Sequence, residues 1–346
     1  MRRCLQALLL SLLLSFATAW PQTNGPKREQ FKNAEVTYGW VQDSAGHKLR
    51  TFTTLPKNAI AKVPAIFFVG WLSCDSVEYA DANTRDGFGV FLRRMIDESG
   101  YATVRLDKPG VGESEGDCAK ADFNSELAGY QAAFDQMLKL DFIDPSQIFV
   151  VGLSNGGGTA VLVPRDHPVR GYVAIGSWGR TWYEHMLELE RRRMAEASKP
   201  PAEINADMRG YVEFYTLFLM KNMTPGAVIS QHPEWKSLWY DEADGQYGRP
   251  AAFYQQLQAL NLGEAWQKVS APVLVIRGTS DTIMSALDSE AIASNVNLVH
   301  PGQASYVQID RMTHGMTEEG KFYDPLVPTV LKWMKEHIPT PPPDNR

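Results

Sequence analysis

The stretch Ile148-Phe-Val-Val-Gly152-Leu-Ser154-Asn-Gly156-Gly-Gly158 decides the fold of this chain. Its first four residues are apolar and largely β-branched, which predicts a short buried strand, and the small residues at its end can begin a helix. Between them lies a Gly-x-Ser-x-Gly pattern, typical of a sharp turn that lifts a serine to the edge of a sheet. Gly152 and Gly156 lack a Cβ atom, so strand and helix can pack closely beside a strained serine. Ser154 is therefore the predicted nucleophile, and a purely structural turn is the alternative.

The N-terminal residues 1–19 have the pattern of a signal peptide. Arg2 and Arg3 form a positive region, residues 8–16 are an apolar run, and residues 17–19 read Ala-Thr-Ala, a typical cleavage site. We therefore expect export to the periplasm or the outside of the cell, with an uncleaved N-terminal anchor as the alternative. After cleavage, no apolar run is long enough to predict a membrane-spanning helix.

The composition is that of a globular protein, and it argues against some classes of binding partner. Of its 346 residues, 44% are hydrophobic and 21% are charged, and this length suits one large domain with an insertion, or two domains. The formal net charge of -6 argues against a nucleic-acid-binding surface. Neither a metal-ligand spacing nor a dinucleotide-binding glycine pattern is present, so we expect no metal and no cofactor. Oligomeric state is not predicted.

Two cysteines, Cys74 and Cys118, remain after removal of the predicted signal peptide, which contains Cys4. In an oxidising compartment an even number of cysteines favours a disulfide between them. Two free buried thiols are the alternative.

Strand and helix patterns alternate through most of the chain. Residues 34–42 and 47–55 flank a turn sequence and predict an antiparallel hairpin, while the polar, Pro-rich residues 20–31 before it predict a linker. The alternation that follows predicts a mostly parallel, doubly wound sheet with helices on both faces. The expected strands are 63–69, 101–106, 148–151, 171–175, 272–277 and 306–309, and the expected helices are 88–98, 124–140, 285–295 and 327–338.

The alternation breaks between residues 180 and 270, which are rich in Trp, Tyr, Met and Glu. We expect an inserted helical cap there, with helices at 182–197, 208–220 and 253–260. The α/β core would then comprise residues 33–179 and 271–338, and the Pro-rich residues 339–346 would form a flexible tail.

Two more polar residues follow predicted strands, where parallel sheets gather their ligand chemistry. Asp281 comes just after the strand at 272–277, and His314 lies in a loop after the last strand. A serine hydroxyl needs a base to take its proton, and the base needs an acid to fix its tautomer. Since the order serine, acid, histidine suits this turn, we predict His314 as the base and Asp281 as the acid. Asp288, inside a predicted helix, and Asp310, too close to His314, are weaker candidates.

A reacting carbonyl would also need two hydrogen-bond donors for its developing negative charge. The backbone N–H of Asn155, directly after the serine, is the first candidate. The second should come from the loop after the strand at 63–69, with Trp71 as first choice and Leu72 as second.

Together these motifs resemble those of serine hydrolases with the α/β-hydrolase fold, over about residues 33 to 338. The loop at 107–114 and the cap most resemble the serine-aminopeptidase-like branch, which contains esterases, lipases, thioesterases and peptidases. Many relatives carry His-Gly before the oxyanion donor, whereas this chain has Val69-Gly70. The resemblance implies fold and mechanism but says little about substrate. It rests on Gly152-Leu-Ser154-Asn-Gly156, Asp107-Lys-Pro-Gly110-Val-Gly112-Glu-Ser114, Val275-Ile-Arg-Gly278-Thr-Ser-Asp281 and Thr313-His314-Gly315.

The expected function is hydrolysis of an ester or related acyl bond through an acyl-enzyme on Ser154, with a small ester or short peptide as substrate. Aromatic residues in the cap suggest an apolar or aromatic substrate group, although they could equally form the core of the cap. The candidate substrate contacts are Trp178, Trp182, Tyr183 and His185.

Two other functions compete with the esterase. A serine peptidase or aminopeptidase of the same fold would need an acid to bind a free amine, and Glu184, Glu188 or Glu213 could supply it. A non-catalytic binding protein on a hydrolase scaffold is the third hypothesis, and an intact set of Ser154, Asp281 and His314 argues against it.

Overall fold

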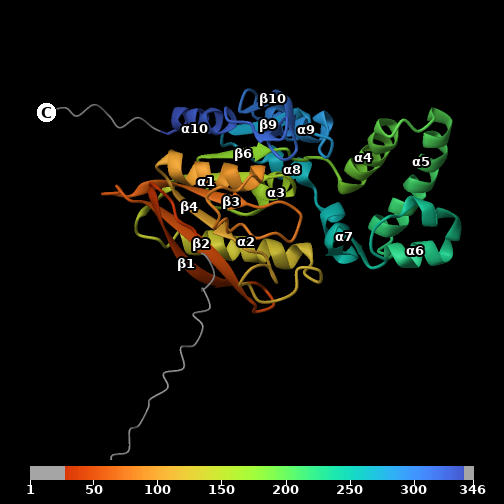
Figure 1. Cartoon of the computed structure of the whole chain (residues 1–346), viewed down its shortest axis with the longest axis horizontal. Helices are drawn as coiled ribbons and strands as arrows, with labels where there is room; N and C mark the ends of the chain where they lie inside the picture. Colours follow the sequence, from red (N-terminus) through yellow and green to blue (C-terminus); the bar gives the residue numbers. More distant parts are fainter. Residues whose placement is uncertain (1–27, 339–346) are drawn as a thin grey trace, which may run out of the picture.

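A mostly parallel sheet of eight strands forms the centre of the structure, a computed structural model that describes residues 28–338 (Figure 1). Across the sheet the order is β1-β2-β4-β3-β5-β6-β9-β10. β1 and β2 form an antiparallel hairpin, β2 pairs antiparallel with β4, and the remaining neighbours are parallel, which confirms the predicted α/β fold class. The strands are β1 (Ala34–Gln42), β2 (Lys48–Pro56), β3 (Val63–Val69), β4 (Ala102–Leu106), β5 (Ile143–Leu153), β6 (Gly171–Ile175), β9 (Val273–Ser280) and β10 (Ala304–Thr313).

Apolar side chains cover both faces of this sheet. In β3, Ala65, Phe67 and Val69 belong to one buried cluster, whereas Ile66 and Phe68 belong to another. Successive side chains of a strand point to opposite faces, so a strand buried on both faces needs an unbroken apolar run. This explains why β3 and β5 are recognisable in the sequence as short apolar segments.

Helices pack on each face, as the doubly wound pattern requires (Figure 1). α2 and α9 contribute to the cluster that contains Phe67, and α1 and α10 contribute to the cluster that contains Ile66. Two further two-residue strands form a small hairpin after β10. These elements are α1 (Gly87–Ser99), α2 (Phe123–Met137), α9 (Ala286–Val299), α10 (Leu326–Glu336), β11 (Thr317–Glu318) and β12 (Lys321–Phe322).

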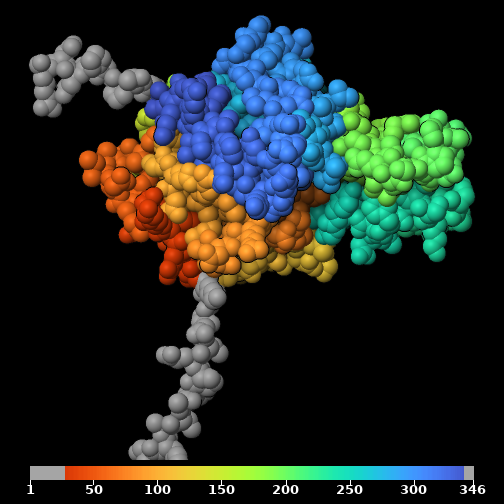
Figure 2. Space-filling model, turned by 45° about the horizontal axis from the view of Figure 1, so that its top comes forward, coloured from red at the N-terminus to blue at the C-terminus, as the bar shows by residue number. Residues whose placement is uncertain are grey.

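The segment between β6 and β9 is helical, and α4, α5 and α6 project to one side of the sheet (Figures 1 and 2). α5 begins at Pro201, well before the predicted start at residue 208, because proline suits the first turn of a helix. A π-helical turn, Thr216–Met220, continues it. The two-residue strands in this segment were not predicted. Its elements are α4 (Trp182–Glu196), α5 (Pro201–Tyr215), α6 (Pro225–Gln231), β7 (Gly245–Gln246), β8 (Arg249–Pro250), α7 (Ala251–Ala259) and α8 (Leu262–Gln267).

The predicted linker ends in a buried ion pair. Residues 1–19 and 339–346, the predicted signal peptide and tail, lie outside the described residues, but residues 28–31 are described. Glu29 is buried, and its carboxylate accepts hydrogen bonds from Arg105 Nη1 and Nη2 at 2.9 and 2.6 Å. It also accepts one from the backbone N–H of Tyr79 at 2.8 Å. The linker prediction is therefore wrong for residues 28–31, because Arg105 on β4 is buried and needs this carboxylate.

We expect Glu29→Ala to lower the free energy of unfolding by about 3 kcal/mol, since it leaves the buried guanidinium of Arg105 without a counter-ion. The matched control is Lys32→Ala at a nearby exposed position, which should change that free energy by less than about 0.5 kcal/mol. Urea unfolding followed by circular dichroism measures both. Equal free energies of unfolding for the two variants would show that the guanidinium of Arg105 is sufficiently stabilised by the carbonyl of Val77, which also accepts a hydrogen bond from it.

Candidate active site

Ser154 lies in a tight turn between β5 and α3 (Asn155–Thr159). Its backbone has φ 55° and ψ -123°, a conformation that non-glycine residues rarely adopt. The neighbouring glycines permit it. A Cβ atom on Gly156 would lie 2.1 Å from the carbonyl oxygen of Gly70, and one on Gly152 would lie 2.4 Å from Cα of Gly157. The Gly-x-Ser-x-Gly pattern thus reflects close contacts between β5, α3 and the end of β3.

The structure brings His314 and Asp281 to this serine. His314 Nε2 lies 3.0 Å from Ser154 Oγ, and His314 Nδ1 lies 2.9 Å from Asp281 Oδ2. Asp281 is buried, and its other oxygen accepts backbone hydrogen bonds from Ile283 and Met284 at 2.9 and 2.8 Å. These bonds hold the carboxylate in one orientation, so the imidazole ring is fixed between an acceptor and a hydroxyl.

The two weaker acid candidates are placed elsewhere. Asp310 is on the exposed part of β10, where its Oδ1 accepts a hydrogen bond from the Thr279 hydroxyl at 3.2 Å. Asp288, at the start of α9, contacts His185 rather than His314.

The backbone around Ser154 presents the candidate oxyanion donors. Asn155 is the first residue of α3, so its N–H has no partner within the helix. The loop after β3 carries Trp71 and Leu72, whose N–H groups form no hydrogen bond within residues 28–338. All three residues line the same cavity as Ser154.

A buried lysine fixes the loop that carries Trp71 and Leu72. Lys108 Nζ donates to the carbonyl oxygen of Trp71 and, at 2.6 Å, to that of Ser73. Burial lowers the pKa of the Lys108 ammonium to about 8. Sequence reasoning did not identify this residue. The available signal was its position directly after β4 in the 107–114 motif, but lysines are mostly exposed.

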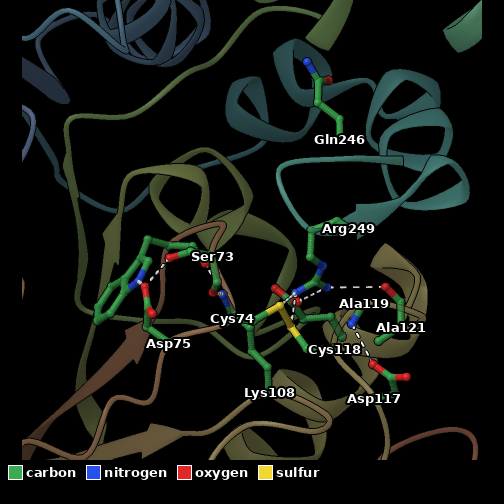
Figure 3. Close-up of a disulfide and its surroundings, with 12 residues drawn as sticks. Ser73, Cys74, Asp75, Lys108, Asp117, Cys118, Ala119, Ala121, Gln246 and Arg249 are labelled. Atoms are coloured by element: carbon green, nitrogen blue, oxygen red, sulfur yellow. Dashed lines mark hydrogen bonds and ion pairs between the residues drawn. A yellow bond between two sulfur atoms is a disulfide. The ribbon is translucent and has the colours of Figure 1, made fainter. Parts of the chain in front are cut away.

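The predicted disulfide between Cys74 and Cys118 is present beside Lys108 (Figure 3). It joins the loop after β3 to the loop after β4. Arg249 of β8 reaches the same point, donating to Cys118 Sγ at 2.9 Å and to the carboxylate of Glu126 on α2. The segment between β6 and β9 is therefore bonded to α2 and to the disulfide that joins these two loops.

A cavity of about 290 Å³ opens beside Ser154. Most of its lining is apolar, and no Asp or Glu among residues 28–338 belongs to it. The lining residues are Trp71, Leu72, Ser73, Phe88, Ser154, Asn155, Trp182, His185, Leu189, Tyr247, Ile283, Met284 and His314.

Of the four predicted substrate contacts, the structure brings Trp182 and His185 to the cavity but not the other two. Trp178 is fully buried and donates from Nε1 to Asn155 Oδ1 at 3.0 Å. It therefore stabilises the turn at Ser154 but does not line the cavity. The hydroxyl of Tyr183 donates to the carbonyl of Val212 at 3.1 Å, away from the cavity. Both were expected to touch substrate because aromatic residues near a site look alike in sequence, whichever way they face.

Within residues 28–338, no three His, Cys, Asp or Glu side chains are grouped so that they could hold a metal ion. No helix in that part of the chain has both the length and the apolar character needed to cross a membrane.

Comparison with known proteins identifies the family. Residues 91–321 match the family described as serine aminopeptidase, S33. Dipeptidyl-peptidase 5 of Porphyromonas endodontalis is 25% identical over 235 residues, which cover 64% of this chain and 33% of that protein. The chain thus spans only about a third of that relative's length.

Solved structures agree on the fold. Est1E from Butyrivibrio proteoclasticus, solved with ferulic acid bound, has a TM-score of 0.58 at 19% identity, covering 86% of this chain and 98% of that one. The acylaminoacyl peptidase of Pyrococcus horikoshii has a TM-score of 0.59 at 13% identity, covering 92% of this chain and 44% of that one. Because the family match spans more than half of its residues, this chain belongs to the serine aminopeptidase S33 family of serine hydrolases, with the α/β-hydrolase fold.

Proposed function

We propose that this protein is an exported esterase that cleaves small esters through an acyl-enzyme on Ser154. The observation that carries the proposal is the hydrogen-bonded series Ser154–His314–Asp281 at the floor of an apolar cavity. Export rests on the N-terminal sequence and is supported by the disulfide, which persists in oxidising compartments.

In this mechanism His314 Nε2 removes the proton from Ser154 Oγ as the oxygen attacks the ester carbonyl carbon. The imidazolium then gives that proton to the departing alcohol, which leaves an acyl group on the serine. Water, deprotonated by the same nitrogen, attacks the acyl carbon. The bond between that carbon and Ser154 Oγ then breaks, the imidazolium returns its proton to Oγ, and the acid leaves. Asp281 keeps the proton on Nδ1 and stabilises the imidazolium in both steps.

Backbone N–H groups of Asn155 and of the loop after β3 would bind the oxyanion, with Trp71 as first choice for the second donor. Lys108 holds this loop in place. Because its ammonium binds the carbonyl of Trp71, the peptide plane that contains the N–H of Leu72 cannot rotate without losing a buried charged hydrogen bond. The N–H of Trp71 belongs to the preceding peptide, so Lys108 acts on it only through the conformation of the adjoining residue.

The cavity favours an ester over the peptidase alternative. An aminopeptidase must bind a free amine with a carboxylate, and the three candidate acids are engaged or placed elsewhere. Glu184 completes the N-terminal capping box of α4, Glu188 pairs with Arg180, and Glu213 is exposed on α5. An apolar lining suits an ester with apolar groups on the carbonyl side or the alcohol side.

The first test compares substrates and the nucleophile. We expect the mature protein to hydrolyse p-nitrophenyl esters much faster than aminoacyl anilides, and Ser154→Ala to lower kcat at least about 1,000-fold. A fluorophosphonate probe should label the wild type and not Ser154→Ala. Faster cleavage of the anilides would favour the peptidase, and an unlabelled wild type would favour the non-catalytic hypothesis.

Lys108→Met should lower kcat about 10- to 100-fold with a smaller effect on KM, because an oxyanion donor acts mainly in the transition state. The matched control Lys120→Met, at an exposed lysine, should keep wild-type rates. Since burial lowers the Lys108 pKa to about 8, the charge is present below pH 8 and lost above it. We therefore expect the wild-type kcat to fall as pH rises through about 8, and this limb to be absent in Lys108→Met. If Lys108→Met kept the wild-type kcat, Lys108 would have no role in the proposed mechanism.

Reduction of the disulfide should lower esterase activity before the protein unfolds, because the bridge holds Cys74, the residue next to Ser73 of the cavity lining, and does not cross the core of the sheet. Activity and circular dichroism are followed together as dithiothreitol increases. The double variant Cys74→Ser/Cys118→Ser is the control and should show no further response to dithiothreitol. Simultaneous loss of activity and fold would assign the bridge to global stability instead.

A further inference from the structure

A second histidine–carboxylate pair lies at the wall of the cavity, separate from the pair that contacts Ser154. His185 on α4 is almost fully buried, and its Nδ1 lies 3.0 Å from Asp288 Oδ2. Asp288 also accepts from Arg180 Nε at 3.0 Å and from the backbone N–H of Ser285 at 3.0 Å. The proposed reaction uses none of these groups.

The surroundings of Asp288 fix which nitrogen of His185 is free. Burial alone would raise the pKa of Asp288, but the hydrogen bond from His185 and the charge of Arg180 outweigh it and hold that pKa well below its usual range. The carboxylate is therefore ionised and can only accept hydrogen bonds, so Nδ1 of His185 must carry a proton. In the neutral ring Nε2 is then an acceptor, and it forms no hydrogen bond with any residue from 28 to 338.

Trp182, on the same helix, carries a second polar group without a partner among residues 28–338. It lies three positions before His185 on α4, on the same face of the helix, and the two ring centroids are 4.9 Å apart. Its Nε1–H is buried and has no acceptor among the described residues. A buried donor without a partner is costly, so a ligand that supplies an acceptor there would remove an existing penalty.

We propose that Trp182 and His185 form a binding site for a hydroxyl group of the substrate. A hydroxyl can accept from Trp182 Nε1–H while it donates to His185 Nε2, and it is the simplest group that satisfies both. The inference rests on the proposed esterase function, because both residues line the cavity that holds Ser154. The preferred substrate is then an ester whose apolar acyl or alcohol part carries a hydroxyl, with Leu189 and Met284 packing against its apolar surface.

The site should discriminate more strongly than an apolar pocket does. A pocket built to hydrogen-bond a hydroxyl disfavours the analogue that lacks it, because the buried polar groups of the protein are then left unpaired. A ketone or carboxylate matches less well than a hydroxyl, since neither can donate to His185 Nε2. If instead the ring were protonated in the complex, the site would offer two donors and would prefer those groups.

The test uses methyl esters of 3-phenylpropanoic acid that carry no ring substituent, a hydroxyl, an acetyl group or a carboxylate, at the meta or para position. For the wild type we expect kcat/KM of one hydroxyl ester to exceed that of the unsubstituted ester by about 10-fold or more. His185→Phe and Trp182→Phe should reduce this ratio to about 1. The matched control His232→Phe removes a histidine that stacks on Trp235 away from the cavity, and should keep the wild-type ratio.

Binding gives a second readout that does not depend on turnover or on the folding of the cavity variants. Calorimetry with Ser154→Ala should show tighter binding of the hydroxylated free acid than of the unsubstituted acid. The hydroxyl site would be overturned by equal kcat/KM values for the hydroxyl and unsubstituted esters, or by equal binding of the two acids. It would also be overturned by a preference for the acetyl or carboxylate ester, or by a hydroxyl preference that persists in His185→Phe. If no ester is hydrolysed, the proposed function fails, and the binding comparison alone decides whether the hydroxyl site exists.

Discussion

The close approach of three backbone segments at Ser154 is the constraint on which the site depends. α3 begins so near the end of β3 that Gly156 leaves no room for a Cβ beside the carbonyl of Gly70. The same contact brings the N–H of Asn155 and the loop that carries Trp71 to one side of the serine. The strained backbone of Ser154 is therefore the result of a packed sheet edge, and the strain is balanced by burial on both faces of β3 and β5.

Much of this arrangement could be predicted from the sequence, because it depends on local patterns. The apolar runs of β3 and β5 identify buried strands, and the glycines around Ser154 identify the turn. Parallel strands bring their carboxyl ends to one edge of the sheet. This edge carries Asp281 and His314, although they are far apart from Ser154 in the chain.

What could not be predicted depends on long-range pairing of charged side chains. Glu29 lies in a polar stretch that reads as a linker, and only the buried Arg105 opposite explains its position. In the sequence, Lys108 and Arg249 look like surface cations. In the structure both are buried against the loops after β3 and β4. His185 was predicted to contact substrate, but from the sequence Asp288 was only a weaker candidate for the acid beside His314. The two residues lie on different helices, and a contact between two helices produces no repeating pattern in the sequence.

The two histidines of the cavity share one arrangement, for which we propose two different purposes. In each, an ionised or hydrogen-bonded carboxylate contacts Nδ1 and leaves Nε2 facing outward. At His314 the outward nitrogen lies 3.0 Å from the hydroxyl of Ser154, which we propose as the nucleophile. At His185 no described hydroxyl of the protein occupies the equivalent position, so the same acceptor is free for a group that arrives with the substrate. One nitrogen would then activate the reaction while the other selects what reacts, and the rigidity of both comes from carboxylates held by backbone N–H groups at the start of α9 and just before it.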